Sequence, residues 1–124
     1  SSPFIVRWPA GLRSTGGFTD EPGHLVDILP TCVELGGGKI PPGLAGTSLL
    51  PAWRGESLGE RTLFWQFAKN RAVRVGDWKL VSALGGPWEL YDLSSDRSEL
   101  RDQSAAQPDR ARALAALWER WETP

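Results

Sequence analysis

His24 is the only histidine of the sequence, and it lies three residues before Asp27 in an apolar segment. A histidine invites a catalytic interpretation because its imidazole titrates near neutral pH. Next to Pro22 and Gly23 at the start of a helix, however, it is more typical of a structural hydrogen-bonding group. Asp27, on the same side of that helix, is then suited to binding a loop amide, and two ligands are too few for a metal site. We therefore predict no catalytic residue and no metal ligand here.

A second group of residues combines basic side chains with Trp65 and Trp78, as in proteins that bind single-stranded nucleic acid. The basic residues are Lys69, Arg71, Arg74 and Lys79. The whole chain has 14 basic and 15 acidic residues and a net charge of -1, so no overall field attracts a polyanion. We therefore predict a solvated basic face over core tryptophans, with no nucleic acid as partner. The nearby acidic residues, expected to pair with the arginines rather than to bind metal, are Glu89, Asp92, Asp96 and Glu99.

The sequence has one cysteine, Cys32, and therefore cannot form an internal disulfide. Because Cys32 lies in an apolar periodic run, we predict a buried and unreactive thiol. No apolar run approaches the ~20 residues that span a bilayer, and no signal segment opens the sequence, so no membrane partner is expected. The absence of methionine, with an apolar run at the start, indicates a piece or a processed product of a longer protein.

The first half of the chain has the pattern of an α/β protein. Residues 3–8 form a short apolar run that predicts a buried strand, which needs a sheet to join. A helix capped by Thr19 or Asp20 is expected to extend to the glycines at 36–38, with a break near Val26 that Pro30 imposes. Residues 39–47 are rich in proline and glycine and resemble a hinge, and residues 48–53 follow as a short capped helical turn.

The second half has the pattern of an α+β domain. Four runs typical of strands, separated by tight turns, predict an antiparallel meander. They cover residues 62–68, 71–75, 78–84 and 88–93. Alternation along the second run gives one apolar and one basic face. Pro108 begins a helix whose apolar side, which includes Leu114 and Trp118, is expected to cover the sheet.

Three separated segments carry a family resemblance. They read SPFIVRWPAG at residues 2–11, PGHLVDILPTC at residues 22–32, and NRAVRVGDWKLV with WELYDL at residues 70–81 and 88–93. Together they resemble the C-terminal region of bacterial arylsulfatases of the formylglycine-dependent type, which belong to the alkaline phosphatase superfamily. The resemblance implies that residues 1–56 are the tail of the catalytic α/β domain. Residues 57–124 would then form the four-stranded antiparallel sheet packed by a C-terminal helix.

The same resemblance implies that the parent enzyme hydrolyses sulfate esters with calcium and a formylglycine nucleophile. The motif that yields this nucleophile, Cys or Ser followed by x-Pro-x-Arg, does not occur in the sequence. We therefore expect no catalytic residue, no metal ligand and no cofactor in this chain, and no activity of the chain alone. The implied partners are a sulfate-ester substrate and the N-terminal catalytic domain. The resemblance allows export to the periplasm or the medium, but the sequence sets no compartment.

Substrate contacts are the role that the resemblance leaves for this piece, because the C-terminal subdomain of sulfatases borders the active-site mouth. The candidates are Gln66, Asn70 and Arg71. Related arylsulfatases usually have Trp-Glu-His before a Gly-Asn-Arg-Ala turn, whereas this chain has WQFAKNRA at residues 65–72. A carboxylate is thus replaced by the amide of Gln66 and an imidazole by the ring of Phe67, which predicts a changed substrate preference or weak activity.

A stand-alone binding or assembly module with the same fold is the alternative. A fragment would leave the strand at residues 3–8 and the apolar helix without their neighbours, which favours dimers or aggregation through exposed apolar surface. A module would instead be a well-behaved monomer or a defined dimer.

Overall fold

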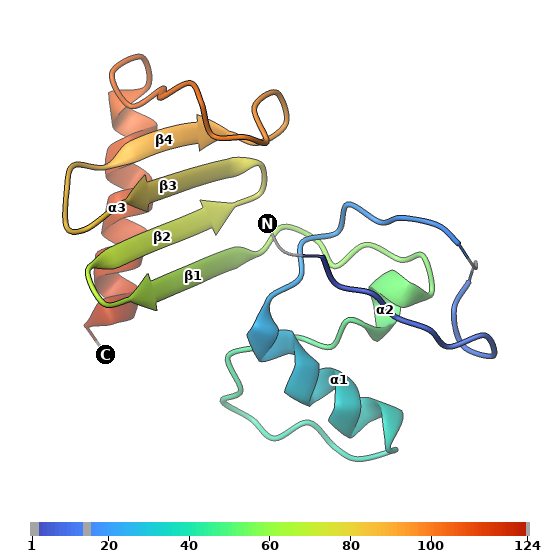
Figure 1. Cartoon of the computed structure of the whole chain (residues 1–124). Coiled ribbons are helices and arrows are strands. Elements are labelled where there is room, and N and C mark those ends of the chain that lie inside the picture. The colour runs from blue at the N-terminus through green and yellow to red at the C-terminus, as the bar shows by residue number, and fades with distance from the viewer. Residues whose placement is uncertain (1–2, 14–15, 124) are drawn as a thin grey trace. The chain divides into compact units, whose positions relative to one another are not determined.

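The computed structural model describes residues 3–13 and 16–123, and the chain divides into two compact units, residues 1–59 and 60–124 (Figure 1). Each unit is described by itself. Within the described ranges, no helix is both long enough and apolar enough to cross a membrane.

The first unit contains a 3-10 helix, η1 (Leu25–Asp27), followed by α1 (Ile28–Leu35) and the short α2 (Leu50–Trp53). Thr31 joins the two α-helices, since its hydroxyl accepts a hydrogen bond from the amide of Leu49 at 2.9 Å. Ser48 accepts another from the amide of Leu50 at 3.2 Å. The short helix expected at residues 48–53 is present as α2, but its N-cap is Leu49, which forms no side-chain cap bond.

The helix expected from Thr19 or Asp20 begins later, because His24 is its N-cap. The Nδ1 atom of His24 accepts a hydrogen bond from the amide of Val26, whereas Thr19 accepts only a local bond from the amide of Glu21. The break predicted near Val26 is confirmed as the junction of η1 and α1. Pro30 lies in the first turn of α1, where its missing amide proton costs no helical hydrogen bond.

Two other expectations for this unit are wrong. Residues 3–8 form no strand, since no described residue supplies the neighbouring strand that a ladder of hydrogen bonds requires. Cys32 is exposed rather than buried. The apolar residues that recur around Cys32 at helical spacing do form one side of α1, but that side is exposed.

The second unit is a sheet with a helix on one face. Its strands are β1 (Thr62–Phe67), β2 (Asn70–Val75), β3 (Trp78–Ser82) and β4 (Glu89–Asp92), in antiparallel order β1-β2-β3-β4. A two-residue turn joins β2 to β3, and Gly76 there has a φ of 56°, which a glycine adopts without strain. This confirms the predicted meander.

The C-terminal helix α3 (Pro108–Glu122) covers one face of the sheet (Figure 1). The core between them is built from one residue of each of the three strands β2, β3 and β4 and from two residues of the helix. These are Val73, Leu80, Leu90, Leu114 and Trp118. The predicted packing of a C-terminal helix beginning at Pro108 on a four-stranded antiparallel sheet is therefore confirmed.

Candidate functional site

The three residues predicted to contact substrate lie at one end of the hairpin formed by β1 and β2. Gln66 is directly opposite Arg71 in the strand register, and Phe67 is opposite Asn70. Cross-strand partners point to the same face, so Gln66 and Arg71 share the face covered by α3, while Phe67 and Asn70 belong to the other. The hairpin thus brings the three residues together but divides them between two faces.

Arg71 lies between aromatic rings on the helix side of the sheet. Its guanidinium carbon is 4.4 Å from the ring centroid of Trp88 and 5.3 Å from that of Trp118. An Nη atom donates a hydrogen bond to the hydroxyl of Ser82 at 3.2 Å, and Ser82 donates in turn to the carbonyl of Gly86 at 2.7 Å. Arg71, on β2, thus contacts Ser82 of β3 and Trp118 of α3 and connects the three elements. A cation over an indole face is a favourable contact.

Arg71 lies on the face that alternation gives to Val73 and Val75, and α3 covers this face. Arg71 is therefore not part of the solvated basic face that was expected. The Nε atom of Arg71 and the indole nitrogen of Trp118 are both buried. No described residue accepts a hydrogen bond from either of them. Trp118 therefore contributes to this cluster through ring contacts rather than through its N–H group.

Asn70 holds the hairpin end against the loop that follows β3. Its Oδ1 accepts a hydrogen bond from the amide of Leu84 at 2.9 Å, and its Nδ2 donates to the carbonyl of Phe67 at 3.3 Å. The amide of Gly85 also donates to the carbonyl of Lys69 at 2.8 Å. The bonds from Leu84 and Gly85 fix the two loops to each other, and the bond to Phe67 closes the turn between β1 and β2.

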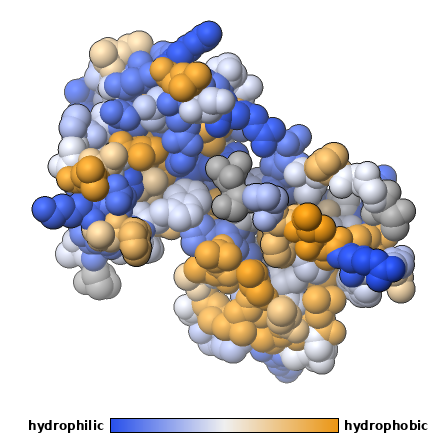
Figure 2. Space-filling view, in the orientation of Figure 1, coloured by the Kyte–Doolittle hydropathy of each residue, from blue (hydrophilic) through white to orange (hydrophobic). Residues whose placement is uncertain are grey.

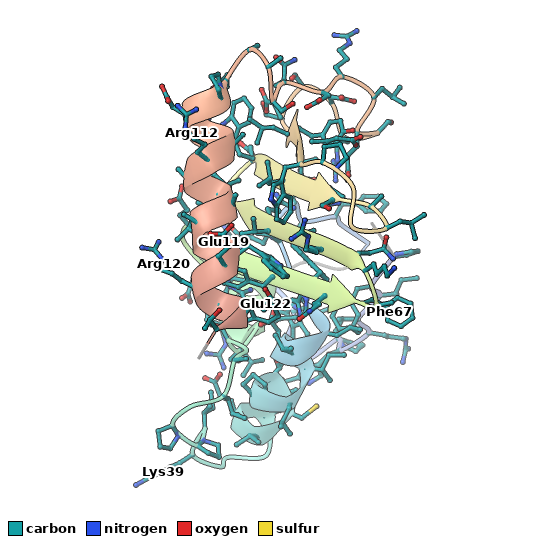
Figure 3. All side chains as sticks on the ribbon, turned by 90° about the vertical axis from the view of Figure 1, so that its left-hand side faces the viewer. Lys39, Phe67, Arg112, Glu119, Arg120 and Glu122 are labelled. Atoms are coloured by element: carbon teal, nitrogen blue, oxygen red, sulfur yellow. The ribbon has the colours of Figure 1, made fainter. Side chains whose placement is uncertain are left out.

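Gln66 is exposed and lies next to the C-terminal end of α3. Its Nε2 donates to a carboxylate oxygen of Glu122 at 3.3 Å. Phe67, which follows it, is 81% exposed and points away from the sheet on the side opposite α3 (Figure 3). The hairpin end therefore offers one amide and one aromatic ring to solvent.

The backbone at this end adopts conformations that are uncommon for residues with a side chain. Ala68 has a φ of 52° and Leu84, in the adjoining loop, a φ of 54°. Such left-handed residues persist where neighbouring contacts hold them, and they occur often at binding sites. Here the bonds of Asn70 supply those contacts, and sequence reasoning had no signal for either residue.

The charged residues of the sheet are paired differently from the prediction. The amino group of Lys79 is 2.6 Å from a carboxylate oxygen of Glu99, whereas Arg74 lies beside Asp77 at 3.9 Å and donates to the carbonyl of Gly76. Asp92 accepts hydrogen bonds from the hydroxyl of Ser94, which lower the pKa of its carboxyl group. The acidic residues therefore bind a lysine and the neighbouring loop rather than the two arginines of β2.

Asp96 also forms hydrogen bonds within its own loop, since its carboxylate accepts from the amides of Leu100 and Arg101 at 2.8 Å each. Across the described ranges, no three histidine, cysteine, aspartate or glutamate side chains gather as metal ligands.

Tyr91 is the single tyrosine of the chain and has an altered acidity. Its hydroxyl donates to a carboxylate oxygen of Glu89 at 2.7 Å, and this bond, together with burial, raises the pKa of Tyr91 to about 12. A raised pKa means that the folded state holds this proton more tightly than the unfolded state, whose tyrosine ionises near 10. Tyr91 thus contributes stability that is present below pH 10 and is lost as pH rises from 10 to 12.

We expect an ultraviolet titration of the folded chain to show tyrosinate absorbance only well above pH 10. The variant Glu89→Gln should move this transition toward pH 10, since it replaces a charged acceptor with a neutral one. Glu99→Gln, which changes a more distant carboxylate, is the control and should shift it less. Titration of the unchanged protein at pH 10, with native circular dichroism, would contradict this account of the hydrogen bond.

His24 and Asp27 form a structural pair, as their spacing predicted. The amide of His24 donates to one carboxylate oxygen of Asp27 at 2.7 Å, and the amide of Thr47 donates to the other at 2.8 Å. Asp27 is fully buried. It therefore joins the start of the helix to the loop before α2, which is the loop-amide role expected from the sequence.

Known proteins resemble this chain over nearly its whole length. The sequence profile of the family described as N-sulphoglucosamine sulphohydrolase, C-terminal, matches residues 1–123. Arylsulfatase K of Danio rerio is 32% identical over 129 residues, which cover 93% of this chain and 24% of that protein. An uncharacterized sulfatase of Schizosaccharomyces pombe is 31% identical over 134 residues, covering 94% of this chain and 24% of the relative.

A solved structure has the same fold. The crystal structure of Ps i-CgsB superposes with a TM-score of 0.69 at 24% identity, over 83% of this chain and 25% of that one. The chain thus spans about a quarter of the length of these three proteins, with 24% of each of the two sulfatases covered. The resemblance to sulfatases drawn from the sequence is confirmed, and the chain belongs to the family of N-sulphoglucosamine sulphohydrolase C-terminal domains.

Proposed function

We propose that this chain is the C-terminal part of an enzyme that hydrolyses sulfate esters, and that it borders the substrate cleft of the complete protein. The observation that carries the proposal is the match of residues 1–123 to a sulfatase C-terminal family, within relatives about four times as long, 24% of which are covered. In this proposal, residues 1–56 end the catalytic α/β domain and residues 57–124 form the small subdomain. The two compact units, which divide at residue 59, support that boundary.

The hairpin end is the part of this chain that we assign to substrate contact. Gln66 would meet substrate through its exposed amide, supported by its position at the end of β1. Asn70 would hold the turn next to Gln66 in place. Arg71, which lies against the ring of Trp88, would supply positive charge at the same end of the sheet. Phe67 has a ring where related arylsulfatases have an imidazole, and proton transfer from that position is not available to this chain.

The chemistry of sulfate-ester cleavage requires groups that we place in the rest of the complete protein. Calcium and formylglycine are implied by the family resemblance. The described residues do not fit a calcium ion, since they form no cluster of three or more metal-binding side chains. No step of the reaction is therefore assigned to a residue of this chain, and the chain contributes to binding and orientation.

The isolated chain should not hydrolyse an aryl sulfate. Displacement at sulfur needs a nucleophile and a Lewis acid in one pocket, and we assign both to the remainder of the enzyme. Purified chain incubated with 4-nitrophenyl sulfate and calcium should release nitrophenolate no faster than buffer alone. Steady turnover that follows the chain through purification would refute this assignment.

The mass of the native polypeptide tests the proposal itself. An antibody raised to this chain should detect, in the source cells, a band several times heavier than 13.6 kDa. That polypeptide, once purified, should hydrolyse a sulfate ester. A band at 13.6 kDa would instead favour the alternative, a stand-alone binding or assembly module.

A further inference from the structure

Two loops of the second unit meet at the side chain of Asn70. Its amide group accepts a hydrogen bond from the amide of Leu84 and donates one to the carbonyl of Phe67, so it joins the loop after β3 to the turn after β1. Ala68 and Leu84 adopt left-handed backbone conformations in these loops, with φ of 52° and 54°. Residues with a side chain keep such conformations only where neighbouring contacts fix them, and the two loops therefore present their side chains from a fixed backbone.

These loops carry two large apolar side chains that lie in solvent. Phe67 is 81% exposed and Leu84 78%. Because the backbones of both residues are bound to the same side-chain amide, they belong to one surface, which together with Lys69 we call the tip surface. At the left edge of Figure 2, where these loops lie, apolar and strongly hydrophilic surface are side by side (Figure 2). Exposed apolar groups on a fixed backbone are typical of a binding site.

The charge of the two loops is entirely positive. Residues 66–71 contain Lys69 and Arg71 but no acidic residue, and residues 83–88 contain no charged residue, although the net charge of the chain is -1. Arg71 lies against the ring of Trp88 on the helix side of the sheet. Lys69 is exposed, and among the described residues it forms no ion pair. Lys69 is therefore the cation of these loops that is available to a ligand.

Two acidic residues at this end of the sheet already have partners. Glu122 accepts a hydrogen bond from Gln66 on the helix side, and Glu89 accepts one from the hydroxyl of Tyr91. The backbone of Lys69 is bound to the loop that carries Leu84, through a bond of 2.8 Å from the amide of Gly85. An available cation thus lies beside exposed apolar side chains, and this combination suits a ligand that has both an apolar ring face and a negative charge.

We propose that Phe67 and Leu84 bind the face of a ring in the sulfate-ester substrate, and that Lys69 binds an anionic group of that substrate other than the sulfate that is cleaved. The ring belongs to an aryl group or to a sugar, since both present an apolar face. No bond is made or broken at the tip surface, and its residues determine specificity rather than the chemical step. The assignment rests on the proposed function and adds the chemistry by which the hairpin end selects a substrate.

Competitive inhibition of the full-length polypeptide tests the two contacts, with 4-nitrophenyl sulfate as the reporter substrate. Glucuronate and benzoate have a ring and a carboxylate, glucose and benzyl alcohol have the ring without the charge, and acetate has the charge without a ring. The inhibition constant of glucuronate or of benzoate should be about fivefold below that of its uncharged counterpart, the size of one exposed ion pair. The tighter of the two charged inhibitors identifies the ring as sugar or aryl. Added salt should reduce the difference between charged and uncharged inhibitors.

Variants assign each contact to its side chain. Lys69→Gln should abolish the preference for the charged inhibitors, whereas the control Lys39→Gln, which changes an exposed lysine of the first unit, should keep it. Phe67→Ala and Leu84→Ala should each weaken the ring-bearing inhibitors relative to acetate. Leu100→Ala is their control, because Leu100 is 81% exposed in the same unit and lies outside the tip surface. Each variant supplies its own ratio of inhibition constants, so a partial loss of activity does not obscure the result.

The outcomes separate this assignment from the proposed function. A full-length enzyme that cleaves 4-nitrophenyl sulfate but keeps its preference for the charged inhibitors in Lys69→Gln, or has none to begin with, would overturn the assignment and leave the proposed function intact. Loss of soluble full-length protein in Phe67→Ala, with native circular dichroism of the same variant of the isolated chain, would mean that protein covers the ring and would also overturn it. A full-length polypeptide that hydrolyses no sulfate ester would overturn both.

Discussion

Trp118→Ala should destabilise the second unit by about 3–5 kcal/mol, the range observed for truncation of a buried aromatic residue. Trp118 is 1% exposed and lies at the centre of the core between α3 and the sheet. Its ring meets Trp88 edge-on at 5.9 Å and lies 5.3 Å from the guanidinium of Arg71. The truncation removes the ring contact, the cation contact and the packing of the core at once.

Two further variants separate these contributions. Trp118→Phe keeps a ring and, because no described residue accepts a hydrogen bond from the indole nitrogen, should cost less than half as much as Trp118→Ala. Trp121→Ala removes a ring that stacks on Phe64 at 5.0 Å but is 44% exposed, so its cost should also be smaller. Urea unfolding followed by far-ultraviolet circular dichroism measures all three, and equal midpoints for Trp118→Ala and Trp121→Ala would contradict this description of the core.

The same substitution has a consequence for the hairpin end. Arg71 is held from two sides by Trp88 and Trp118, and it is the register partner of Gln66. Loss of one indole leaves a half-buried cation with one aromatic contact and the hydroxyl of Ser82. In the complete enzyme we therefore expect Trp118→Ala to weaken substrate binding as well as stability, although its ring contacts no substrate.

The sheet was predictable from the sequence because its signals are local. Alternating apolar residues and the Gly76-Asp77 turn determine β2 and β3, and Pro108 determines where α3 begins. By contrast, the local sequence does not determine which side of a strand or helix faces the core, because this depends on the elements that pack against it. Arg71 was assigned to a face by alternation, but only the position of α3 reveals that this face is the covered one.

The first unit shows the same limit more strongly. Periodicity located the stripe that contains Cys32 but gave it the wrong side, because the buried side of α1 is made of Asp27, Pro30 and Thr31. Residues 3–8 have the composition of a strand, yet a strand forms only where a neighbour accepts its hydrogen bonds. Both errors arise where the folded arrangement depends on contacts beyond the segment itself.

Asp27→Ala should destabilise the first unit by about 2–4 kcal/mol, since it removes two part-buried hydrogen bonds to a carboxylate, and hydrogen bonds to charged groups contribute about 1.5–3 kcal/mol each when well buried. Those amides belong to His24 and Thr47, and they approach different oxygens of one carboxylate. Gly46 makes the approach close, because a Cβ there would lie 2.0 Å from the carbonyl oxygen of Val26. Gly46 therefore allows the backbone approach that brings the amide of Thr47 to the carboxylate of Asp27.

Asp27→Asn is the matched variant, because it keeps the size of the side chain and one carbonyl oxygen while turning the second acceptor into a donor. We expect Asp27→Asn to lose one of the two hydrogen bonds and to destabilise the unit by about half as much as Asp27→Ala. Amide hydrogen exchange resolves the two bonds, since Thr47 and His24 should both exchange faster in Asp27→Ala and only one of them in Asp27→Asn. Unchanged exchange at Thr47 in Asp27→Ala would show that the loop is held by other contacts, whereas loss at both amides would establish the buried carboxylate as the joint between α1 and the segment that leads to α2.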